Sequence, residues 1–158
     1  MKVNEGAIAA VCARLGHGDA GVRRAAVEAL GQVAEKGDEG AIAAVCARLE
    51  HGDAGVRLAA VRALAQVAEK GNERAIAAAC ARLEHGDAGV RRAAVEALAQ
   101  VAEKGDEGAI AAVCARLEQG DAGVRLAAVR ALAQVAAKGN ERAIAAECAR
   151  LELCRIHI

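Results

Sequence analysis

The stretch "HGDAGVRRAAVEALGQVAEKGDEG" spans His17 to Gly40, and it decides the fold because the chain repeats it. Versions with a few changed letters begin at His51 and His85, and a fourth begins at Gln119. The isoleucines and cysteines between these stretches recur every 34 residues, at Ile8, Ile42, Ile76, Ile110, Ile144 and at Cys12, Cys46, Cys80, Cys114, Cys148. A fixed interval of this size predicts a solenoid, in which each unit buries its apolar face only by stacking on its neighbours.

The composition favours helices along the whole chain. Hydrophobic residues make up 55% of the 158 residues, no proline is present to break a helix, and Ser, Thr and the aromatic residues are absent. Ala, Leu, Glu, Lys and Arg are strong helix formers. We therefore expect an all-α fold, an α-solenoid or superhelix of antiparallel helix pairs. It forms one domain, 1–158, with repeats at about 4–37, 38–71, 72–105 and 106–139, and with a terminal helix and tail at 140–158.

Each repeat contains two helical patterns. The first runs from Asp38, a candidate N-cap, towards Gly52, a candidate stop, and its apolar residues have the spacing of one helical stripe: Ile42, Val45, Cys46 and Leu49. The second runs from Asp53 to Gly71. Its predicted buried stripe is Val56, Ala60, Leu64 and Val67, whereas the opposite arc holds Leu58, Arg62, Ala65 and Glu69. The patterns predict about nine helices, near 5–15, 20–36, 39–50, 54–70, 73–84, 88–104, 107–118, 122–138 and 141–152.

The charge balance argues against several classes of partner. The formal net charge is zero, with 21 Lys plus Arg against 21 Asp plus Glu. No overall field therefore attracts nucleic acid or anionic lipid, and no aromatic side chain offers a stacking platform for bases. The apolar stretches are too short to span a bilayer and do not form a signal peptide. We expect a cytoplasmic protein with no nucleic-acid partner, no membrane contact and no cofactor.

The second pattern resembles a known repeat family. The core "D-x-x-V-R-x-A-A-x-x-A-L" stands at Asp19 to Leu30, Asp53 to Leu64, Asp87 to Leu98 and Asp121 to Leu132. It is similar to HEAT-like repeats, especially the short type of phycobilisome lyases. On a helical wheel Arg57 falls inside the apolar arc. The resemblance implies that such arginines form a hydrogen-bonded ladder with aspartates between successive repeats, through Asp19/Arg23, Asp53/Arg57, Asp87/Arg91 and Asp121/Arg125.

The cysteines are expected to fill the core. Five of the six hold one helical position, and equivalent stacked helices lie roughly 8–10 Å apart, farther than the Cα atoms of a disulfide. Free thiols suit a reducing compartment. Cys154 lies outside the repeat and is the candidate to react or to link two chains. The pairs Cys12/His17, Cys46/His51 and Cys80/His85 do not have a recognised zinc spacing, so we expect no metal site and solvated loop histidines.

No catalytic constellation is evident. Deoxyhypusine hydroxylase, a HEAT-like enzyme, holds two irons with His-Glu pairs early in the second helix of several repeats. The matching positions here are Arg24-Ala25, Leu58-Ala59, Arg92-Ala93 and Leu126-Ala127, so its ligands are missing. The chain has no Ser nucleophile and no Cys–His pair evidently placed for catalysis. We expect no enzyme activity. A bilin lyase-like or chaperone-like accessory protein stays an alternative, because lyase chemistry largely uses a cysteine of the partner.

The exposed stripe of the second helices is the predicted binding surface. "RRAAVEAL" alternates with "RLAAVRAL", so acid and base alternate along the solenoid. Two interpretations are compatible: a ladder of salt bridges between neighbouring helices, or a groove of mixed charge with apolar anchors for a peptide or protein. If the second helices line the concave side, as in the family, the partner-binding residues are Arg24, Glu28, Leu58, Arg62, Arg92, Glu96, Leu126 and Arg130.

The ends of the array differ from its middle. Glu147 stands where the other first helices have Val11, Val45, Ala79 and Val113, which predicts a terminal cap at the ninth helix. The tail 153–158 abandons the repeat, and the first helix shows no polar conversion. We expect a homo-oligomer through the terminal repeats or the tail. The high identity between copies also leaves open a designed or synthetic array without a natural partner.

Overall fold

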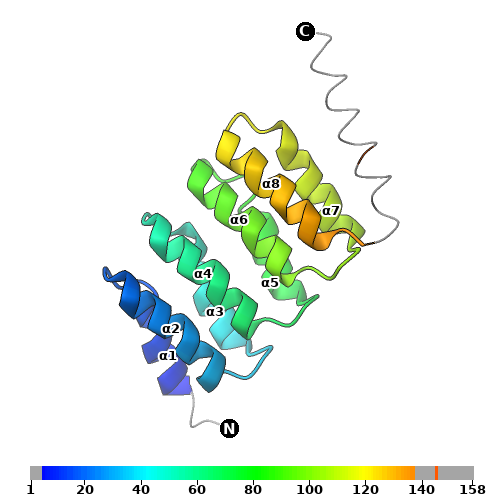
Figure 1. Ribbon diagram of the computed structural model, residues 1–158. Helices are drawn as coiled ribbons and strands as arrows, with labels where there is room; N and C mark the ends of the chain where they lie inside the picture. Colours follow the sequence, from blue (N-terminus) through cyan, green and yellow to red (C-terminus); the bar gives the residue numbers. More distant parts are fainter. Residues whose placement is uncertain (1–4, 138–144, 146–158) are drawn as a thin grey trace.

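The computed structural model describes residues 5–137 and 145, and it confirms the helical solenoid (Figure 1). Within 5–137 there are eight α-helices and two short 3-10 helices. The first helices of the repeats are α1 (Glu5–Arg14), α3 (Glu39–Ala47), α5 (Glu73–Ala81) and α7 (Glu107–Cys114). The second helices are α2 (Ala20–Val33), α4 (Ala54–Val67), α6 (Ala88–Val101) and α8 (Ala122–Val135). The 3-10 helices η2 (Arg48–Glu50) and η3 (Ala115–Glu118) follow α3 and α7.

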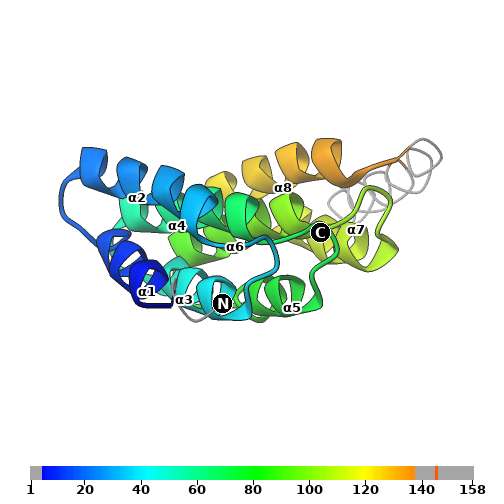
Figure 2. The ribbon, with the colours of Figure 1, turned by 90° about the horizontal axis from the view of Figure 1, so that it is seen from below.

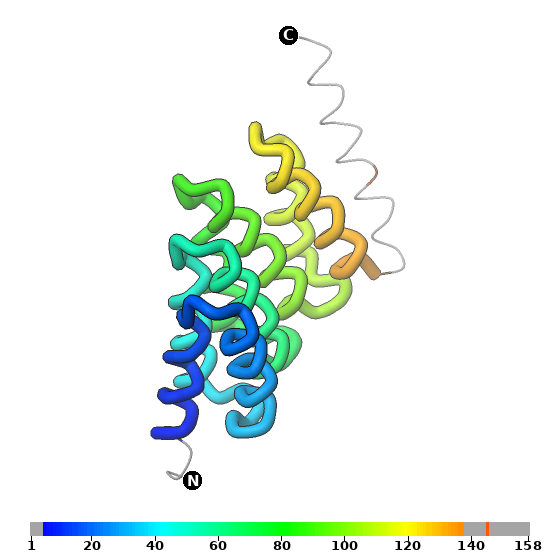
Figure 3. The backbone as a smooth tube through the Cα atoms, turned by 60° about the vertical axis from the view of Figure 1, so that its left-hand side comes forward, coloured from blue at the N-terminus to red at the C-terminus, as the bar shows by residue number. Residues whose placement is uncertain are grey.

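The helices form two layers. Figure 2 shows the second helices side by side in one layer and the first helices in the other, and Figure 3 shows the same staggered stack along the backbone. The second helices pack on one another more closely than the first helices do. A stack bends towards the layer in which its units lie closer together. The second helices therefore line the concave side.

The predicted N-caps are confirmed. The side chain of Asp53 accepts a hydrogen bond from the backbone N–H of Val56, with a distance of 3.1 Å. Asp19, Asp87 and Asp121 cap the other second helices in the same way. Asp38, Asn72 and Asp106 cap first helices. These bonds satisfy amide groups that the first helical turn leaves unpaired, so each helix begins at a defined residue.

The predicted ends of the second helices were wrong by about one turn. Helix α4 ends at Val67 and not near residue 70, and Ala68 is already extended. The N–H of Gly71 donates across to the carbonyl of Val101 in the next repeat, with a distance of 2.7 Å. Gly71 has a φ of +83°, a conformation that favours glycine. This contact between repeats, repeated at Gly37 and Gly105, overrides the helical preference of the residues before it.

The first helices are also shorter than predicted. The predicted segment 39–50 divides into α3 and η2, and 107–118 divides into α7 and η3. Helix α5 ends at Ala81 and not near residue 84, and α1 ends at Arg14. The tighter last turn points Leu49 and Leu83 into the core, where both are buried. The predicted ninth helix 141–152, with Glu147, and the tail 153–158 lie outside the described residues apart from Ala145, which is helical.

The core follows the predicted stripes. Val56, Ala60, Leu64 and Val67 are all buried, as are Ile42, Val45, Cys46 and Leu49. Cys12 and Cys114 are buried as well, whereas Cys80 is half-buried. Burial raises the pKa of the Cys12, Cys46 and Cys80 thiols, because the low-dielectric surroundings disfavour the thiolate. These cysteines therefore pack as small apolar side chains in the stack.

Candidate functional site

A hollow between α2 and α4 gathers four of the predicted binding residues. Arg24 and Glu28 come from α2, and Leu58 and Arg62 come from α4. The hollow has a volume of about 420 Å³. Leu58 is 43% exposed, although it is a large apolar side chain. The capped first turns of the two helices set the register of these side chains, and the hollow combines an apolar wall with charges of both signs.

A second hollow adjoins the first between α4 and α6. It has a volume of about 300 Å³, and Leu58, Arg92 and Glu96 are among its lining residues. Leu58 therefore separates the two hollows. The remaining predicted residues, Leu126 and Arg130, are exposed on α8 and line neither of these hollows. We use the name concave groove for the surface that consists of Arg24, Glu28, Leu58, Arg62, Arg92, Glu96, Leu126 and Arg130.

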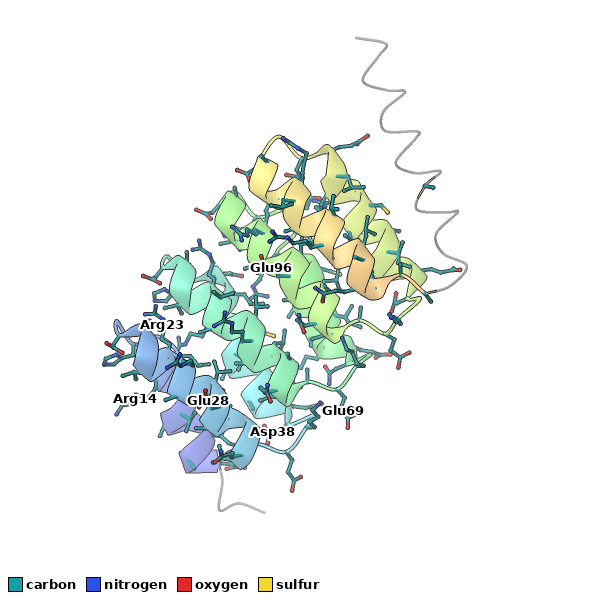
Figure 4. The ribbon with its side chains drawn as sticks, viewed as in Figure 1. Arg14, Arg23, Glu28, Asp38, Glu69 and Glu96 are labelled. Carbon is teal, nitrogen blue, oxygen red and sulfur yellow. The ribbon has the colours of Figure 1, made fainter. Side chains whose placement is uncertain are left out.

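The predicted ladder of salt bridges along the concave groove is wrong for the described residues. Glu96 pairs with Arg92 of its own helix, at 3.0 Å between Nε and Oε1. No ion pair with a described residue is formed by Glu28, Arg62 or Arg130. The distance between the helices leaves hollows where the ladder was expected. Figure 4 labels Glu28 on α2 and Glu96 on α6, with α4 between them.

The first-helix layer, on the convex side, pairs its charges across repeats. Arg74 lies 3.2 Å from Glu39, Arg82 lies 2.8 Å from Glu50, and Arg116 lies 2.6 Å from Glu84. Each of these pairs joins one repeat to the next. Three arginines of the convex layer therefore have carboxylate partners in the neighbouring repeat, whereas Arg14 and Arg48 of that layer have none among the described residues. Arg24, Arg62 and Arg130 of the second helices have none either.

The arginines of the family motif are placed differently from the implied ladder. Arg23 Nη1 donates to the carbonyls of His17 at 2.7 Å and Gly18 at 2.9 Å, in the loop before its own helix. The aspartate side chains accept from backbone amides instead. Backbone N–H groups of Val56 and Gly55 lower the pKa of Asp53 most, and the positive charge of the half-buried Arg23 in the preceding repeat lowers it further. The motif arginines donate to loop carbonyls, and no hydrogen bond joins them to the motif aspartates among the described residues.

Polar side chains outside the predicted set also line the first hollow. Arg23 and Gln66 both line the hollow between α2 and α4. Gln66 follows Arg62 by one helical turn, so the helical period could have identified it. Arg23 could not have been identified in this way, because its Cα lies on the apolar arc and only its long side chain reaches the hollow.

The loop histidines have a structural role that the sequence pattern does not indicate. Nδ1 of His51 accepts the backbone N–H of Asp53 at 3.0 Å, and His17 and His85 repeat the contact. The cysteine of each Cys–His pair lies in or beside the core. In the described part of the chain, no group of three or more His, Cys, Asp or Glu side chains is arranged to hold a metal ion. None of its helices is long and apolar enough to cross a membrane.

Comparisons with known proteins agree with this architecture. The family of HEAT repeats matches residues 8–99 and 76–146. A solved structure of an engineered protein is similar over 91% of this chain and 70% of its own, with 26% identity and a TM-score of 0.52. A second engineered protein gives 84% and 64% coverage, 24% identity and a TM-score of 0.48. No curated protein matches. The chain is a helical repeat scaffold, and it belongs to the HEAT-repeat family.

Proposed function

We propose that this protein is a non-catalytic scaffold that binds an acidic segment of a partner protein or peptide along the concave groove. The observation that carries the proposal is the excess of unpaired arginines over unpaired carboxylates along the concave groove. Arg24, Arg62 and Arg130 are exposed on the second helices without a carboxylate partner among the described residues. An acidic partner supplies the missing carboxylates.

Charge in the groove supports an acidic partner over a basic one. Glu96 is already paired with Arg92, so Glu28 is the one carboxylate of the named groove residues without an ion pair among the described residues. Arg23 adds a further positive charge to the first hollow. Complementary charge raises the rate of encounter and fixes the orientation of the bound segment.

Two exposed leucines set the spacing of apolar anchors. Leu58 on α4 and Leu126 on α8 are 43% and 51% exposed and hold equivalent positions two repeats apart. Neighbouring packed helices lie about 8–10 Å apart, so the two leucines are separated by roughly 16–20 Å. A helical ligand covers this span with about 11–13 residues, and an extended one with about 5–6. The expected ligand therefore combines acidic residues with two apolar side chains at one of these spacings.

The test is a selection from a random peptide library that is long enough to span both leucines. The selection uses the full chain under reducing conditions, so that free thiols do not capture peptides. We expect the selected peptides to be rich in Asp and Glu and to contain apolar anchors. Their affinity should fall at least about tenfold in Arg62→Glu, because the substitution reverses a charge that the peptide contacts.

The matched control is Arg74→Glu. It changes the net charge by the same amount, but Arg74 lies on the convex side and pairs there with Glu39. Far-UV circular dichroism shows whether both variants are folded. Selected peptides that bind Arg62→Glu and Leu58→Ala as tightly as the unchanged protein would exclude the concave groove as their binding site. Peptides weakened equally by both charge reversals would show a non-specific charge effect.

A further inference from the structure

Helix α8, the second helix of the last described repeat, exposes a face that α2, α4 and α6 bury. Val27, Val61 and Val95 hold equivalent positions and are 8%, 5% and 0% exposed. Val129 holds the same position on α8 and is 57% exposed. Since only the last member of the series is uncovered, this position faces the following repeat. Among the described residues, nothing covers that face of α8.

Helix α2, the second helix of the first repeat, exposes the opposite face. Ala59 and Ala63 on α4 are 5% and 0% exposed, and their counterparts on α6 are equally buried. Ala25 on α2 is exposed, and Ala29 is half-buried. These positions therefore face the preceding repeat. Helix α2 presents the small, apolar surface that receives a preceding second helix elsewhere in the stack.

We propose that a second copy of this chain docks its α2 on the open face of α8, head to tail. Helix α8 has the same fourteen residues as α4, "AGVRLAAVRALAQV". Helix α2 differs from α6 at one position, with Gly31 in place of Ala99. Gly31 faces Gln66 of α4 in its own chain, on the side of α2 away from the proposed junction. A contact between α8 and α2 of a second copy therefore repeats the residues of the α4–α6 contact inside the chain.

Charge complementarity also favours a second copy as the occupant. Glu28, Arg62, Glu96 and Arg130 alternate in sign from α2 to α8. Docking α2 next to α8 places Glu28 of the second copy next in the series after Arg130, so the alternation of charge sign continues across the junction. Inside the chain Arg62 and Glu96 of neighbouring helices form no ion pair, so this is a match of charge sign and not an ion pair across the junction.

One expectation from the sequence keeps this association weak. The sequence predicts a further first helix at 141–152. Such a helix and α1 of the second copy would compete for the same position in the first-helix layer. A head-to-tail contact does not close on itself, so the mass should rise steadily with concentration and not stop at a dimer.

The experiment is sedimentation equilibrium of the full chain with a reductant, over about 10 µM to 1 mM, a range suited to weak association. Interference optics are needed because the chain has no aromatic residue. We expect the weight-average mass to rise above that of the monomer. Val129→Glu and Ala25→Lys should each weaken association at least about tenfold, because each places a charge in the apolar junction. Ala43→Glu, at an exposed position on α3, is the control and should not change it.

Mixing the two variants makes the test specific for the head-to-tail arrangement. The Ala25→Lys chain keeps an intact α8 face, and the Val129→Glu chain keeps an intact α2 face. Each variant alone should be monomeric, whereas the mixture should form dimers and nothing larger. A monomeric unchanged protein at every concentration would overturn the proposal. So would an Ala25→Lys variant that still associates, or a mixture that stays monomeric. The peptide-binding test uses other residues, so either proposal can fail alone.

Discussion

Arg23 of one repeat lies directly against Gly55 of the next. A Cβ atom at Gly55 would meet Arg23 Nη2 closer than non-bonded atoms approach, and Arg57 stands in the same relation to Gly89. The absence of a side chain at Gly55 lets the guanidinium extend across the junction. From there Arg23 also reaches the carbonyls of His17 and Gly18.

The first prediction concerns this glycine. Gly55→Ala should displace Arg23 and weaken its charge-assisted hydrogen bonds. Gly21→Ala is the matched control, because its new Cβ would meet the carboxylate of Asp19 at 3.0 Å, as that of Gly55 meets Asp53 at 3.0 Å, but no arginine. We measure urea unfolding by far-UV circular dichroism. The free energy of unfolding of Gly55→Ala should be about 1 kcal/mol lower than that of Gly21→Ala.

A double mutant checks the cause. In an Arg23→Ala background the guanidinium is absent, so Gly55→Ala should cost no more than Gly21→Ala does. Equal free energies of unfolding for Gly55→Ala and Gly21→Ala in the unchanged background would contradict the prediction. A difference that persists without Arg23 would trace it to some other contact of Gly55.

The second prediction concerns the positive φ of Gly71. Gly71→Ala should lower the free energy of unfolding by about 1–2 kcal/mol, because an L side chain is strained at this φ. Gly71→Asn should be less harmful, since Asn tolerates this region better than Ala. Gly86→Ala is the control: it lies in a loop, has nothing within 4 Å of a new Cβ and has no positive φ. Similar stabilities for Gly71→Ala and Gly86→Ala would show that the conformation of Gly71 carries no strain.

The third prediction concerns acid stability. The backbone N–H of Val22, Val56 and Val90 holds the pKa of Asp19, Asp53 and Asp87, respectively, below its usual range. Because these folded-state pKa values lie below those of the unfolded chain, the unfolded state takes up protons first as the pH falls. The stabilisation is complete above the ordinary aspartate pKa of about 3.9, and it is lost as the pH falls through the folded-state values. The melting temperature should therefore drop below about pH 4.

Asparagine at these three positions isolates the effect. Asn72 already caps a first helix, so Asp19→Asn, Asp53→Asn and Asp87→Asn should keep the caps and remove the titration. The triple variant should lose less melting temperature between pH 5 and pH 3 than the unchanged protein. A control with Glu73, Glu107 and Glu118 changed to Gln removes the same number of charges elsewhere. An unaltered pH dependence in the Asn variant would show that the caps do not cause the acid sensitivity.

The sequence predicted the elements and most of the core. The interval of 34 residues, the caps at Asp38 and Asp53 and the apolar stripe through Leu64 depend on neighbours within one helix or one loop. Such patterns are visible in a linear sequence. The exposure of Leu58 and Arg62 followed from the same helical period.

The sequence by itself thus determined a HEAT-like stack, its helix starts and the faces that its helices bury. Only the tertiary structure decided where the second helices end, how the arginines are paired and where the hollows lie. These features depend on the distance between repeats. Gly71 ends its segment through a carbonyl of the next repeat, and Arg62 lies across a hollow from Glu28 without an ion pair. Such contacts join residues of different helices, and the helical period, which relates neighbours on one helix, does not indicate which of them meet.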